Sequence, residues 1–324
     1  MDINLKPIMS IAVTGGAGFI GSHVCEALLG KGLDVVCIDN FNDYYNPKFK
    51  EENISECLKN KNFKLHRKDI TNINDLRTVF KKNKIEKVIH LAARAGVRPS
   101  IEQPVLYEQA NVLGTLNMLM MAKDFKAENF VFGSSSSIYG NTKEIPFSES
   151  SKTDSPVSPY AATKKSAELM CHAYSHMYNI PMTCLRLFTA YGPRGRPDMA
   201  PYKFTELIYN NKELEMFGDG KTKRDYTYVK DIVDGILAAV GKEFKFEVIN
   251  LGNSKPVELR QFISIIEENL GKKAKIKKMP LQPGEVDVTY ADVKKAERLL
   301  TWKPKTDIKN GMKKFIEWYK NERA

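Results

Sequence analysis

Residues 13–21 read VTGGAGFIG, and this run follows an apolar β-branched segment and opens a helical pattern. Glycines at this spacing permit a tight turn, a close approach of the backbone to a pyrophosphate, and close packing of a helix on a strand. The N-terminus of the following helix would face the phosphates. Glycines that only shape a turn are the alternative. The stretch predicts a dinucleotide-binding turn with these contact residues: Gly15, Gly18, Phe19, Ile20 and Gly21.

An acidic residue closes the second apolar run, LDVVCID (33–39). Asp39 is placed to accept hydrogen bonds from both ribose hydroxyls and would repel a 2′-phosphate, so the sequence favours NAD over NADP. A loop cap is the other role for this carboxylate. The runs KDI (68–70) and HLAA (90–93) close the third and fourth strands, at the sheet edge where a dinucleotide must lie. Further cofactor contacts are expected from Asn40, Asp69 beside the adenine, Ile70, Leu91, Ala92 and Ala93.

Apolar β-branched runs alternate with helix-period segments as far as PMTCLRLF (181–188). This pattern is typical of a parallel sheet that is covered on both faces. The expected fold is α/β, with a doubly wound parallel (Rossmann-like) sheet forming a dinucleotide-binding domain in residues 1–188. Residues 189–324 carry shorter elements and predict a smaller C-terminal α/β substrate domain over the carboxyl ends of the strands. Parts of 225–255 are expected to return to the main sheet.

Composition restricts the class of protein. The chain has 324 residues, 42% of them apolar, and a net charge of +11. Its lysines lie in short tracts such as KKAKIKK (272–278), which is typical of solvated faces, so no nucleic-acid partner is expected. No apolar run suits a membrane span or an export signal, which indicates a cytoplasmic protein with no membrane partner. The five cysteines are scattered and predict neither disulfides nor a zinc site.

Two segments suggest chemistry. SPYAATKK (158–165) places Tyr160 and Lys164 on one face of a helix predicted over 160–178. The lysine ammonium, together with an oxidised nicotinamide, would lower the pKa of the phenol from about 10 toward neutrality and make a general base. Alone, this pair is common on protein surfaces, but here the serine-rich strand end GSSSSIYG (133–140) precedes it. His90 is interpreted as a packed strand residue rather than a catalyst.

Taken together, these features resemble the extended short-chain dehydrogenase/reductase family, and specifically its nucleotide-sugar epimerases. The resemblance covers nearly the whole chain and rests on the glycine turn, Asp39, HLAA, the serine run, the Tyr160/Lys164 pair and these segments: NVLGT (111–115), GDGKTKRDYTYVKD (218–231) and ADVKKAERLLTWKP (291–304). It implies three catalytic residues, Tyr160, Lys164 and Ser135. It also places Asn111 and Ser134 at the cofactor, and Ser136 at the sugar.

The serine run also bears on the type of reaction. Family members that eliminate water carry adjacent Asp and Glu at the positions of Ser136 and Ser137, and uronate decarboxylases carry a Glu at the second position. Elimination needs an acid and a base at neighbouring sugar carbons, whereas epimerisation needs one proton relay and a reversible hydride transfer. The serines in this chain favour epimerisation. For Ser137, a simple capping role at the strand end remains open.

The resemblance implies a mechanism. Tyr160 takes the proton of the sugar 4-hydroxyl while hydride leaves the same carbon for NAD. The 4-keto sugar then rotates about its phosphate linkage, and hydride returns to the opposite face. NAD is regenerated in each turnover and no metal is expected. Helices predicted over 105–125 and 160–178 form a dimer interface in this family, so a homodimer is expected.

The substrate end is interpreted from three stretches. Arg224, in the pattern G-D-G-x-x-x-R-D-Y, suits the sugar diphosphate because a guanidinium makes bidentate charged hydrogen bonds; a solvated arginine is the alternative. FTAYGPRGRPDMA (188–200) resembles the loop of UDP-glucuronate 4-epimerases, with Thr189 and Arg196 at the sugar carboxylate. The remaining substrate contacts implied by the resemblance are Arg98, Gln282 and Glu285.

Three departures from that subgroup leave alternatives open. Arg194 replaces a tryptophan, Glu285 replaces an aspartate, and Asp287 stands where proline is usual. Arg196 could then brace a loop or bind phosphate. The preferred interpretation is a 4-epimerase of UDP-glucuronate, and the alternative enzyme is a UDP-glucose or UDP-N-acetylglucosamine 4-epimerase. A net dehydrogenase and a protein that binds NAD and a nucleotide-sugar without reacting are the other possibilities.

Overall fold

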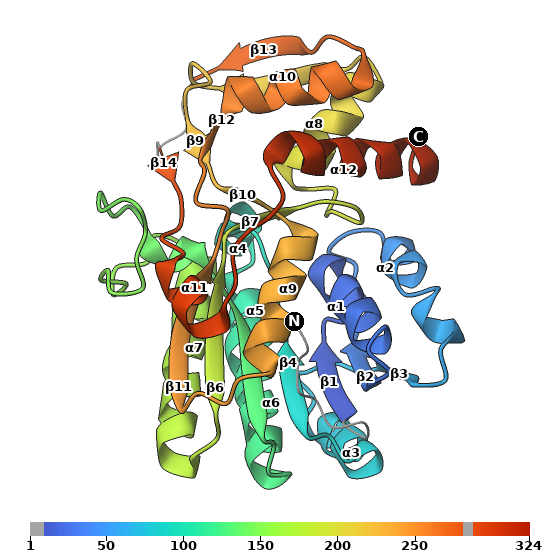
Figure 1. The fold of residues 1–324 in the computed structure, drawn as a ribbon, viewed down its shortest axis with the longest axis vertical. Helices are drawn as coiled ribbons and strands as arrows, with labels where there is room; N and C mark the ends of the chain where they lie inside the picture. The colour runs from blue at the N-terminus through green and yellow to red at the C-terminus, as the bar shows by residue number, and fades with distance from the viewer. Residues whose placement is uncertain (1–9, 281–287) are drawn as a thin grey trace.

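The computed structural model describes residues 10–280 and 288–324 (Figure 1). Within these ranges, seven parallel strands form the main sheet, in the order β11-β6-β5-β4-β1-β2-β3. β1 and β4 are neighbours at the point where the strand order reverses, which is where doubly wound sheets open a crevice. The predicted α/β fold is confirmed. The strands are β1 (Ser10–Thr14), β2 (Asp34–Asp39), β3 (Phe63–Arg67), β4 (Lys87–His90), β5 (Asn129–Ser135), β6 (Met182–Leu187) and β11 (Phe246–Leu251).

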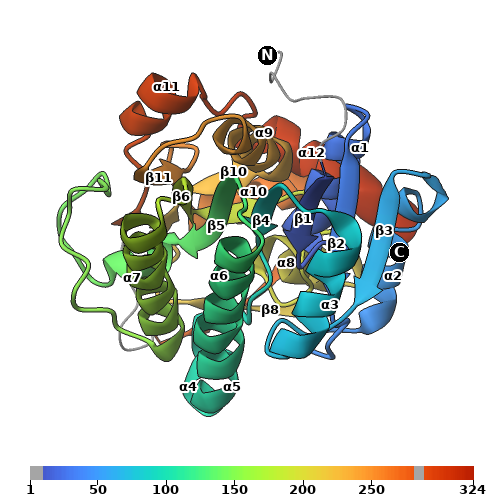
Figure 2. The same ribbon diagram turned by 90° about the horizontal axis from the view of Figure 1, so that it is seen from below.

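Helices cover both faces of this sheet (Figure 2). Successive side chains of β1 point to opposite faces, so Ile11 and Val13 enter one hydrophobic core and Ala12 enters the other. The first core is formed with α1 (Phe19–Leu29), α9 (Val229–Val240) and α11 (Lys294–Leu300), and the second with α3 (Ile73–Asn83), α6 (Gly114–Asp124) and α7 (Pro159–Tyr178).

The ends of α7 follow from local sequence. The Ser158 hydroxyl accepts a hydrogen bond from the backbone N–H of Ala161, and Pro159 occupies the first helical position, where its missing N–H costs nothing. Asn179 adopts a left-handed conformation (φ 54°) and ends the helix. These boundaries place Tyr160 in the first turn, at the carboxyl-terminal end of the sheet.

The helix predicted over 105–125 is interrupted. It consists of α5 (Pro104–Glu108), a π-helical segment (Gln109–Leu113) and α6. The wider π turn carries Asn111, which is buried and whose side-chain amide binds the backbone of Arg94 and the hydroxyl of Thr163 on α7. A single apolar period could not predict this interruption, which coincides with polar contacts to distant residues.

Other local predictions need correction. β3 ends at Arg67 and not at Ile70, because the Asp69 carboxylate accepts bonds from the backbone N–H and the hydroxyl of Thr71 and turns the chain. The lysine tract that contains KKAKIKK includes a strand, β13 (Lys275–Met279). The sequence also gave no prediction for α2 (Pro47–Asn53) and α4 (Val97–Glu102), or for the short helical turns at Cys57–Lys59 and Ser136–Tyr139.

The remaining elements lie beyond the carboxyl ends of the main strands (Figure 1). They form small sheets in which β7 (Thr189–Tyr191) pairs with β10 (Tyr226–Tyr228), β8 (Glu213–Phe217) with β13, and β9 (Lys223–Arg224) with both β12 (Val257–Glu258) and β14 (Val288–Thr289). The helices here are α8 (Ala200–Tyr209), α10 (Leu259–Leu270) and α12 (Ile308–Glu322). β11 returns to the main sheet beside β6, while the division of the chain at residue 188 stays an interpretation.

A buried carboxylate joins these small sheets to the body. Asp225 accepts backbone N–H bonds from Asn253, Ser254 and Ala291, at 2.7 to 3.0 Å, and a hydroxyl bond from Thr227. Burial raises its pKa, and these four donors act against that rise. Asp225 thus fastens three separate chain segments around β9 and β10.

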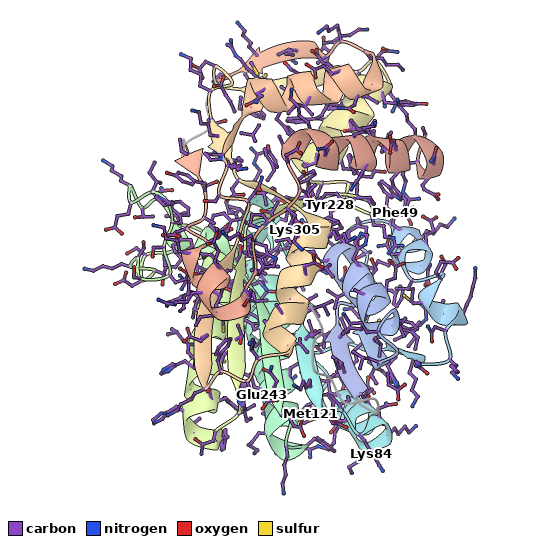
Figure 3. The ribbon with its side chains drawn as sticks, in the orientation of Figure 1. Phe49, Lys84, Met121, Tyr228, Glu243 and Lys305 are labelled. Atoms are coloured by element: carbon purple, nitrogen blue, oxygen red, sulfur yellow. The ribbon has the colours of Figure 1, made fainter. Side chains whose placement is uncertain are left out.

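The opposite end of the sheet carries ordinary structural polar contacts. Lys87, at the start of β4, is buried and pairs with Glu243 at 3.1 Å; Figure 3 labels Glu243 at this end.

In the described part of the chain, no helix has the length and apolar character to cross a membrane. Nor do residues 10–280 and 288–324 hold a group of three or more His, Cys, Asp or Glu side chains that suits a metal ion. The five cysteines are free thiols and are buried.

Candidate active site

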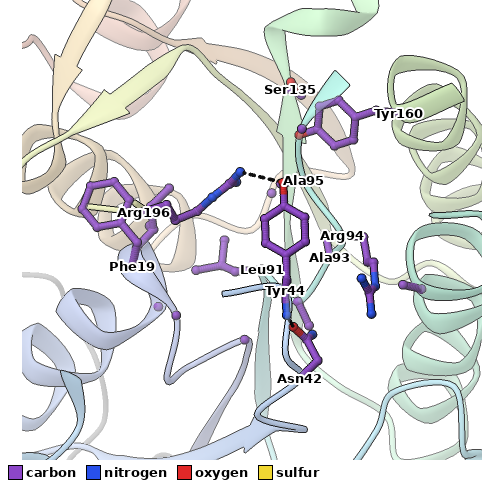
Figure 4. A pocket seen from close by; sticks show the side chains of 18 of the residues that line it. Phe19, Asn42, Tyr44, Leu91, Ala93, Arg94, Ala95, Ser135, Tyr160 and Arg196 are labelled. Atoms are coloured by element: carbon purple, nitrogen blue, oxygen red, sulfur yellow. Dashed lines mark hydrogen bonds between the residues drawn. The ribbon is translucent and has the colours of Figure 1, made fainter. Parts of the chain in front are cut away.

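A pocket of about 510 Å³ opens at the carboxyl ends of the central strands, between the main sheet and the loop at 192–199 (Figure 4). Its volume suits a small-molecule ligand. Most of the predicted cofactor and catalytic residues meet here, although they come from distant parts of the chain. Those lining the pocket are Gly15, Gly18, Phe19, Ile20, Gly21, Asp39, Asn40, Asp69, Ile70, Leu91, Ala92, Ala93, Ser134, Ser135, Ser136, Tyr160, Lys164, Thr189 and Arg196.

The glycine turn closes one wall. Gly15 has φ +67°, a conformation that residues with a side chain rarely adopt, and its N–H bonds to the carbonyl of Ile38 on β2 at 2.8 Å. A Cβ on Gly15 would lie 2.8 Å from the backbone N of Ala92, and one on Gly21 would lie 2.1 Å from the carbonyl O of Gly15. Glycine is therefore required by contact here, and the N-terminus of α1 faces the pocket.

Asp39 ends β2 at the pocket, as predicted, but its carboxylate is already engaged. One oxygen accepts a bond from the backbone N–H of Phe41 at 2.9 Å and the other from Ala17 at 3.2 Å. Lys50, which the sequence analysis did not identify, lies 3.6 Å away in a buried ion pair. The loop-cap role is thus present, and a ribose would share this carboxylate with the turn.

Asp69 and Asn40 lie next to each other. The Asn40 amide donates to Asp69 at 2.7 Å, and the bonds from Asn40 and Thr71 lower the pKa of Asp69. The carboxylate therefore stays ionised at neutral pH on the far side of the glycine turn. This position is consistent with the contact to an adenine that the sequence suggested.

The serines at the end of β5 do not all face the same way. The Ser135 hydroxyl accepts a bond from the backbone N–H of Ser137 and donates to the Ser137 hydroxyl, both at 3.1 Å. The Ser134 hydroxyl turns away, donating to buried Glu168 on α7 at 2.7 Å. Ser134 lines the pocket with its hydroxyl bound to Glu168, and its expected place at the cofactor stays a prediction.

Tyr160 lies half-buried beside Ser135. Burial raises the pKa of the phenol, whereas hydrogen bonding with Ser135 and the charge of Arg196 lower it. The Lys164 ammonium donates to the carbonyl of Gly133 at 2.7 Å and lies 4.8 Å from the ring of Phe132. In the protein alone, burial outweighs the nearby charges and raises the pKa of Tyr160. The predicted fall requires an oxidised nicotinamide as well, and it stays a prediction.

His90 is a packed strand residue, as interpreted from the sequence. It is fully buried at the end of β4, with its ring nitrogens 2.6 Å from the Thr14 hydroxyl and 3.0 Å from that of Thr115. Burial and the charge of Lys164 lower its pKa to about 3. The imidazole is therefore neutral and takes no part in proton exchange near neutral pH.

Arg196 enters the pocket from the 192–199 loop but already has a partner. Its Nε and one terminal nitrogen bind both carboxylate oxygens of Asp198, and its plane lies 5.2 Å from the ring of Tyr44. Figure 4 shows the bond from Arg196 to the Tyr44 hydroxyl crossing the pocket below Tyr160 and Ser135. Tyr44 and Asp198 were missed because only the folded chain brings residue 44 to residue 198.

Arg194, one of the departures from the resembled subgroup, ties the same loop to α1. It adopts φ 64° and donates to Glu26 at 2.6 Å. Beside it, His23 bonds to the carbonyl of Pro193 at 2.9 Å. The arginine here joins the loop to the cofactor-side helix through an ion pair.

Three other predicted residues, Arg98, Asn111 and Arg224, are not among the residues that line the pocket. Arg98, on α4, lies 5.4 Å from the ring of Phe217, and Arg224, on β9, donates to the carbonyl of Lys223. Asn111 supports the pocket from behind through the backbone of Arg94. Gln282 and Glu285, and the departure at Asp287, lie outside the described residues.

Comparison with known proteins agrees with this geometry. The model of a family described as GDP-mannose 4,6 dehydratase matches residues 12–315. The chain belongs to this family of nucleotide-sugar enzymes within the extended short-chain dehydrogenases/reductases. One relative in the family, UDP-glucuronate 4-epimerase of Thermodesulfobacterium geofontis, is 46% identical over 95% of both chains.

Two solved structures of the family are similar to this chain in fold to the same degree. UDP-glucuronic acid 4-epimerase from Bacillus cereus, in complex with UDP-glucuronic acid and NAD, has a TM-score of 0.90 and 38% identity, covering 97% of this chain and 99% of its own. UDP-glucose 4-epimerase from Thermotoga maritima, with UDP-glucose, also has a TM-score of 0.90, with 31% identity over 98% of this chain and 100% of its own. The fold alone therefore does not separate acidic from neutral sugars.

The glycine turn of this family member gives a stability test. We expect Gly21→Ala to lower the free energy of unfolding by about 3 kcal/mol or more, since its Cβ meets a backbone carbonyl that cannot move aside. Gly18→Ala is the matched control, because Gly18 has φ −74° and its Cβ would lie 3.1 Å from the nearest atom. Urea unfolding of both variants measures the difference. Equal stability would show that the close approach at Gly21 is not required.

Proposed function

We propose that the chain is an NAD-dependent 4-epimerase of a UDP-sugar and that it interconverts UDP-glucuronate and UDP-galacturonate. The observation that carries the proposal is the pairing of half-buried Tyr160 with Ser135 at a strand end that has Ser136 and Ser137 in place of acids, with Arg196 in the same pocket. The named relatives are 4-epimerases of UDP-sugars, which supports the reaction type.

The pocket fits NAD. Gly15 and Gly21 leave a cradle that a Cβ would fill, and the start of α1 presents backbone N–H groups to a pyrophosphate. Asp39 and Asp69 line the adenosine side, where two carboxylates disfavour a 2′-phosphate. When bound, NAD supplies an acceptor that takes hydride from sugar C4 and returns it, and its positive charge favours the Tyr160 phenolate.

The chain's own residues manage the proton. Tyr160 accepts the proton of the 4-hydroxyl and returns it in the second half of the reaction, with Ser135 holding the same sugar oxygen. Lys164 supplies a buried cation one helical turn from Tyr160, fixed by the Gly133 carbonyl. No side chain in the serine run is acidic enough to expel a sugar hydroxyl, so these residues would not promote elimination from a 4-keto sugar.

Arg196 and Thr189 select the uronate in this proposal. The guanidinium is close enough to Tyr160 for each to influence the pKa of the other. Asp198 occupies the edge formed by Nε and one terminal nitrogen, so the remaining terminal nitrogen is directed to a substrate carboxylate. A charged hydrogen bond of this kind, in a pocket with little water, favours an anionic sugar.

A neutral hexose is the second candidate, and the same ion pair supports it. Because Asp198 already neutralises Arg196, a substrate without a carboxylate leaves no unpaired charge in the pocket. The similarity to a UDP-glucose 4-epimerase is compatible with this alternative.

Substrate preference can be measured by proton NMR of the protein incubated in parallel with UDP-glucuronate, UDP-glucose and UDP-N-acetylglucosamine. We expect UDP-galacturonate to form in the first tube alone. Arg196→Met should lower kcat/KM for UDP-glucuronate by about ten- to a hundredfold, the loss of one charged hydrogen bond. Arg194→Met is the matched control on the same loop, since its side chain faces α1. Conversion of a neutral sugar only would leave the mechanism and overturn the uronate assignment.

Tyr160→Phe tests the catalytic assignment. Without the phenol oxygen, turnover should fall by about 10² to 10⁴ while NAD remains bound, because general acid–base catalysis is lost and the cofactor cradle is intact. Tyr107→Phe is the control, as this ring packs edge-on against Tyr160 at 6.2 Å with its own hydroxyl bound to a backbone carbonyl. Unchanged turnover in Tyr160→Phe would refute the assignment, and stoichiometric NADH with wild type would indicate a net dehydrogenase.

A homodimer is part of the proposal. Large apolar side chains are exposed on adjacent helices on one side of the sheet, among them Ile101 (64% exposed) on α4, Val105 (65%) on α5 and Leu169 (59%) on α7; Figure 2 shows these helices together. A cluster of this kind indicates an interface. Light scattering should give twice 36.8 kDa for the wild type, and a lower mass for a Val105→Lys, Leu169→Lys double variant. A wild-type mass of one chain would contradict the dimer.

A further inference from the structure

α7 carries a third polar residue in register with Tyr160 and Lys164. Glu168 follows Lys164 by one helical turn, so all three lie on the face that packs against β5. It is 3% exposed, which is rare for a carboxylate without a strong partner. Neither the sequence analysis nor the proposed mechanism gave Glu168 a role.

Glu168 and Lys164 hold two successive residues of β5 from the same face of α7. The Lys164 ammonium donates to the carbonyl of Gly133 at 2.7 Å, and the hydroxyl of the next residue, Ser134, donates to Glu168 at 2.7 Å. The residue after that is Ser135, beside Tyr160. These two bonds therefore set the register between the strand end and the helix that together present Ser135 and Tyr160.

The Glu168 carboxylate is itself held rigidly. Arg186 on β6 binds both of its oxygens at 3.0 Å, in a pair in which both side chains are buried. The guanidinium lies 4.8 Å from the ring of Tyr139, whose hydroxyl donates to Asn250 at 2.7 Å. The Glu168 carboxylate is thus fixed by Ser134 on β5 and by Arg186 on β6.

Lys164 is surrounded mainly by neutral groups, so the charge of the Glu168 carboxylate affects the pKa of its ammonium. Burial lowers its pKa to about 8, while Cys171 and Glu168 on α7 and Cys184 on β6 act in the opposite direction. On β4, His90 faces the ammonium as a neutral imidazole, and Phe132 on β5 presents its ring. Both cysteines are buried thiols, and burial raises the pKa of Cys184 well above its usual range. Glu168 is the carboxylate among these neighbours.

We propose that Glu168 is a positioning residue for the reaction, holding the Gly133–Ser134 peptide against α7 and keeping Lys164 cationic during turnover. The inference rests on the proposed function, in which Lys164 supports the Tyr160 phenolate. A buried ion pair that only joined α7 to β6 would need neither the bond to Ser134 nor a place one turn from Lys164.

The test is the pH profile of kcat for the full-length protein with the substrate that wild type converts. Turnover should fall as Lys164 loses its proton, because its folded-state pKa marks the alkaline limb. Glu168→Gln keeps the size and an acceptor for Ser134 but removes the charge that raises this pKa. We expect the alkaline limb of the kcat profile to move to lower pH by about half to one unit. At pH values above this limb, kcat should then be about three- to tenfold lower than that of the wild type, while KM changes by less than about twofold.

Two further variants keep the test decisive. Glu168→Gln leaves Arg186 unpaired, so a Glu168→Gln, Arg186→Met double variant removes both buried charges and should fold, with the limb again moved down. Glu149→Gln is the matched control, because Glu149 is a partly buried carboxylate that reaches the same network through the backbone of Asn250 and has no contact with Lys164. Its limb should stay within about 0.2 unit of wild type.

Loss of activity at every pH with an unmoved limb in both Glu168 variants would overturn the proposal and leave a structural ion pair. An equal shift in Glu149→Gln would also overturn it, because the effect would then belong to any buried carboxylate. Wild-type turnover is measured in the same series. Failure of the proposed function would therefore appear as absent wild-type conversion, separately from the behaviour of Glu168.

Discussion

The approach of α1 to the turn after β1 is the constraint on which the rest of the pocket depends. The Cα of Gly21 lies so close to the carbonyl of Gly15 that no side chain fits between them, and Gly15 in turn lies against the backbone of Ala92 after β4. The first and fourth strands therefore end side by side, at the point where the strand order reverses. The helix N-terminus, the serine strand end of β5 and the start of α7 are all arranged around this point.

The parallel sheet could be predicted because the information is local. Each buried strand is an apolar run, each helix has its own period, and the glycine turn carries its geometry in its residue types. Tyr160, Lys164 and Asp39 were found for the same reason, since each occupies a recognisable place relative to a strand or a helical turn. The lysine-rich strand β13 was missed because its side chains are exposed and give no apolar signal.

The contacts that the sequence could not predict are polar and join distant residues. Tyr44 reaches Asp198, Ser134 reaches Glu168, and Asn111 reaches Thr163; each pair meets only when separate elements have packed. The rise in the pKa of Tyr160 in the protein alone has the same origin, because the desolvation that causes it is a property of the whole fold. The Ser134 hydroxyl is engaged because its acceptor, Glu168, lies on α7 and not on β5.

The loop of residues 192–199 is held at two points. Arg194 binds Glu26 on α1, and Arg196 and Asp198 bind the Tyr44 hydroxyl after β2. All of its anchors lie on elements that shape the cofactor side of the pocket. A change of sugar preference made by exchanging this loop alone would leave Glu26 and Tyr44 facing the wrong partners. An engineer who wishes to transplant specificity between relatives should therefore treat residues 22–26, residue 44 and the loop as one inherited unit.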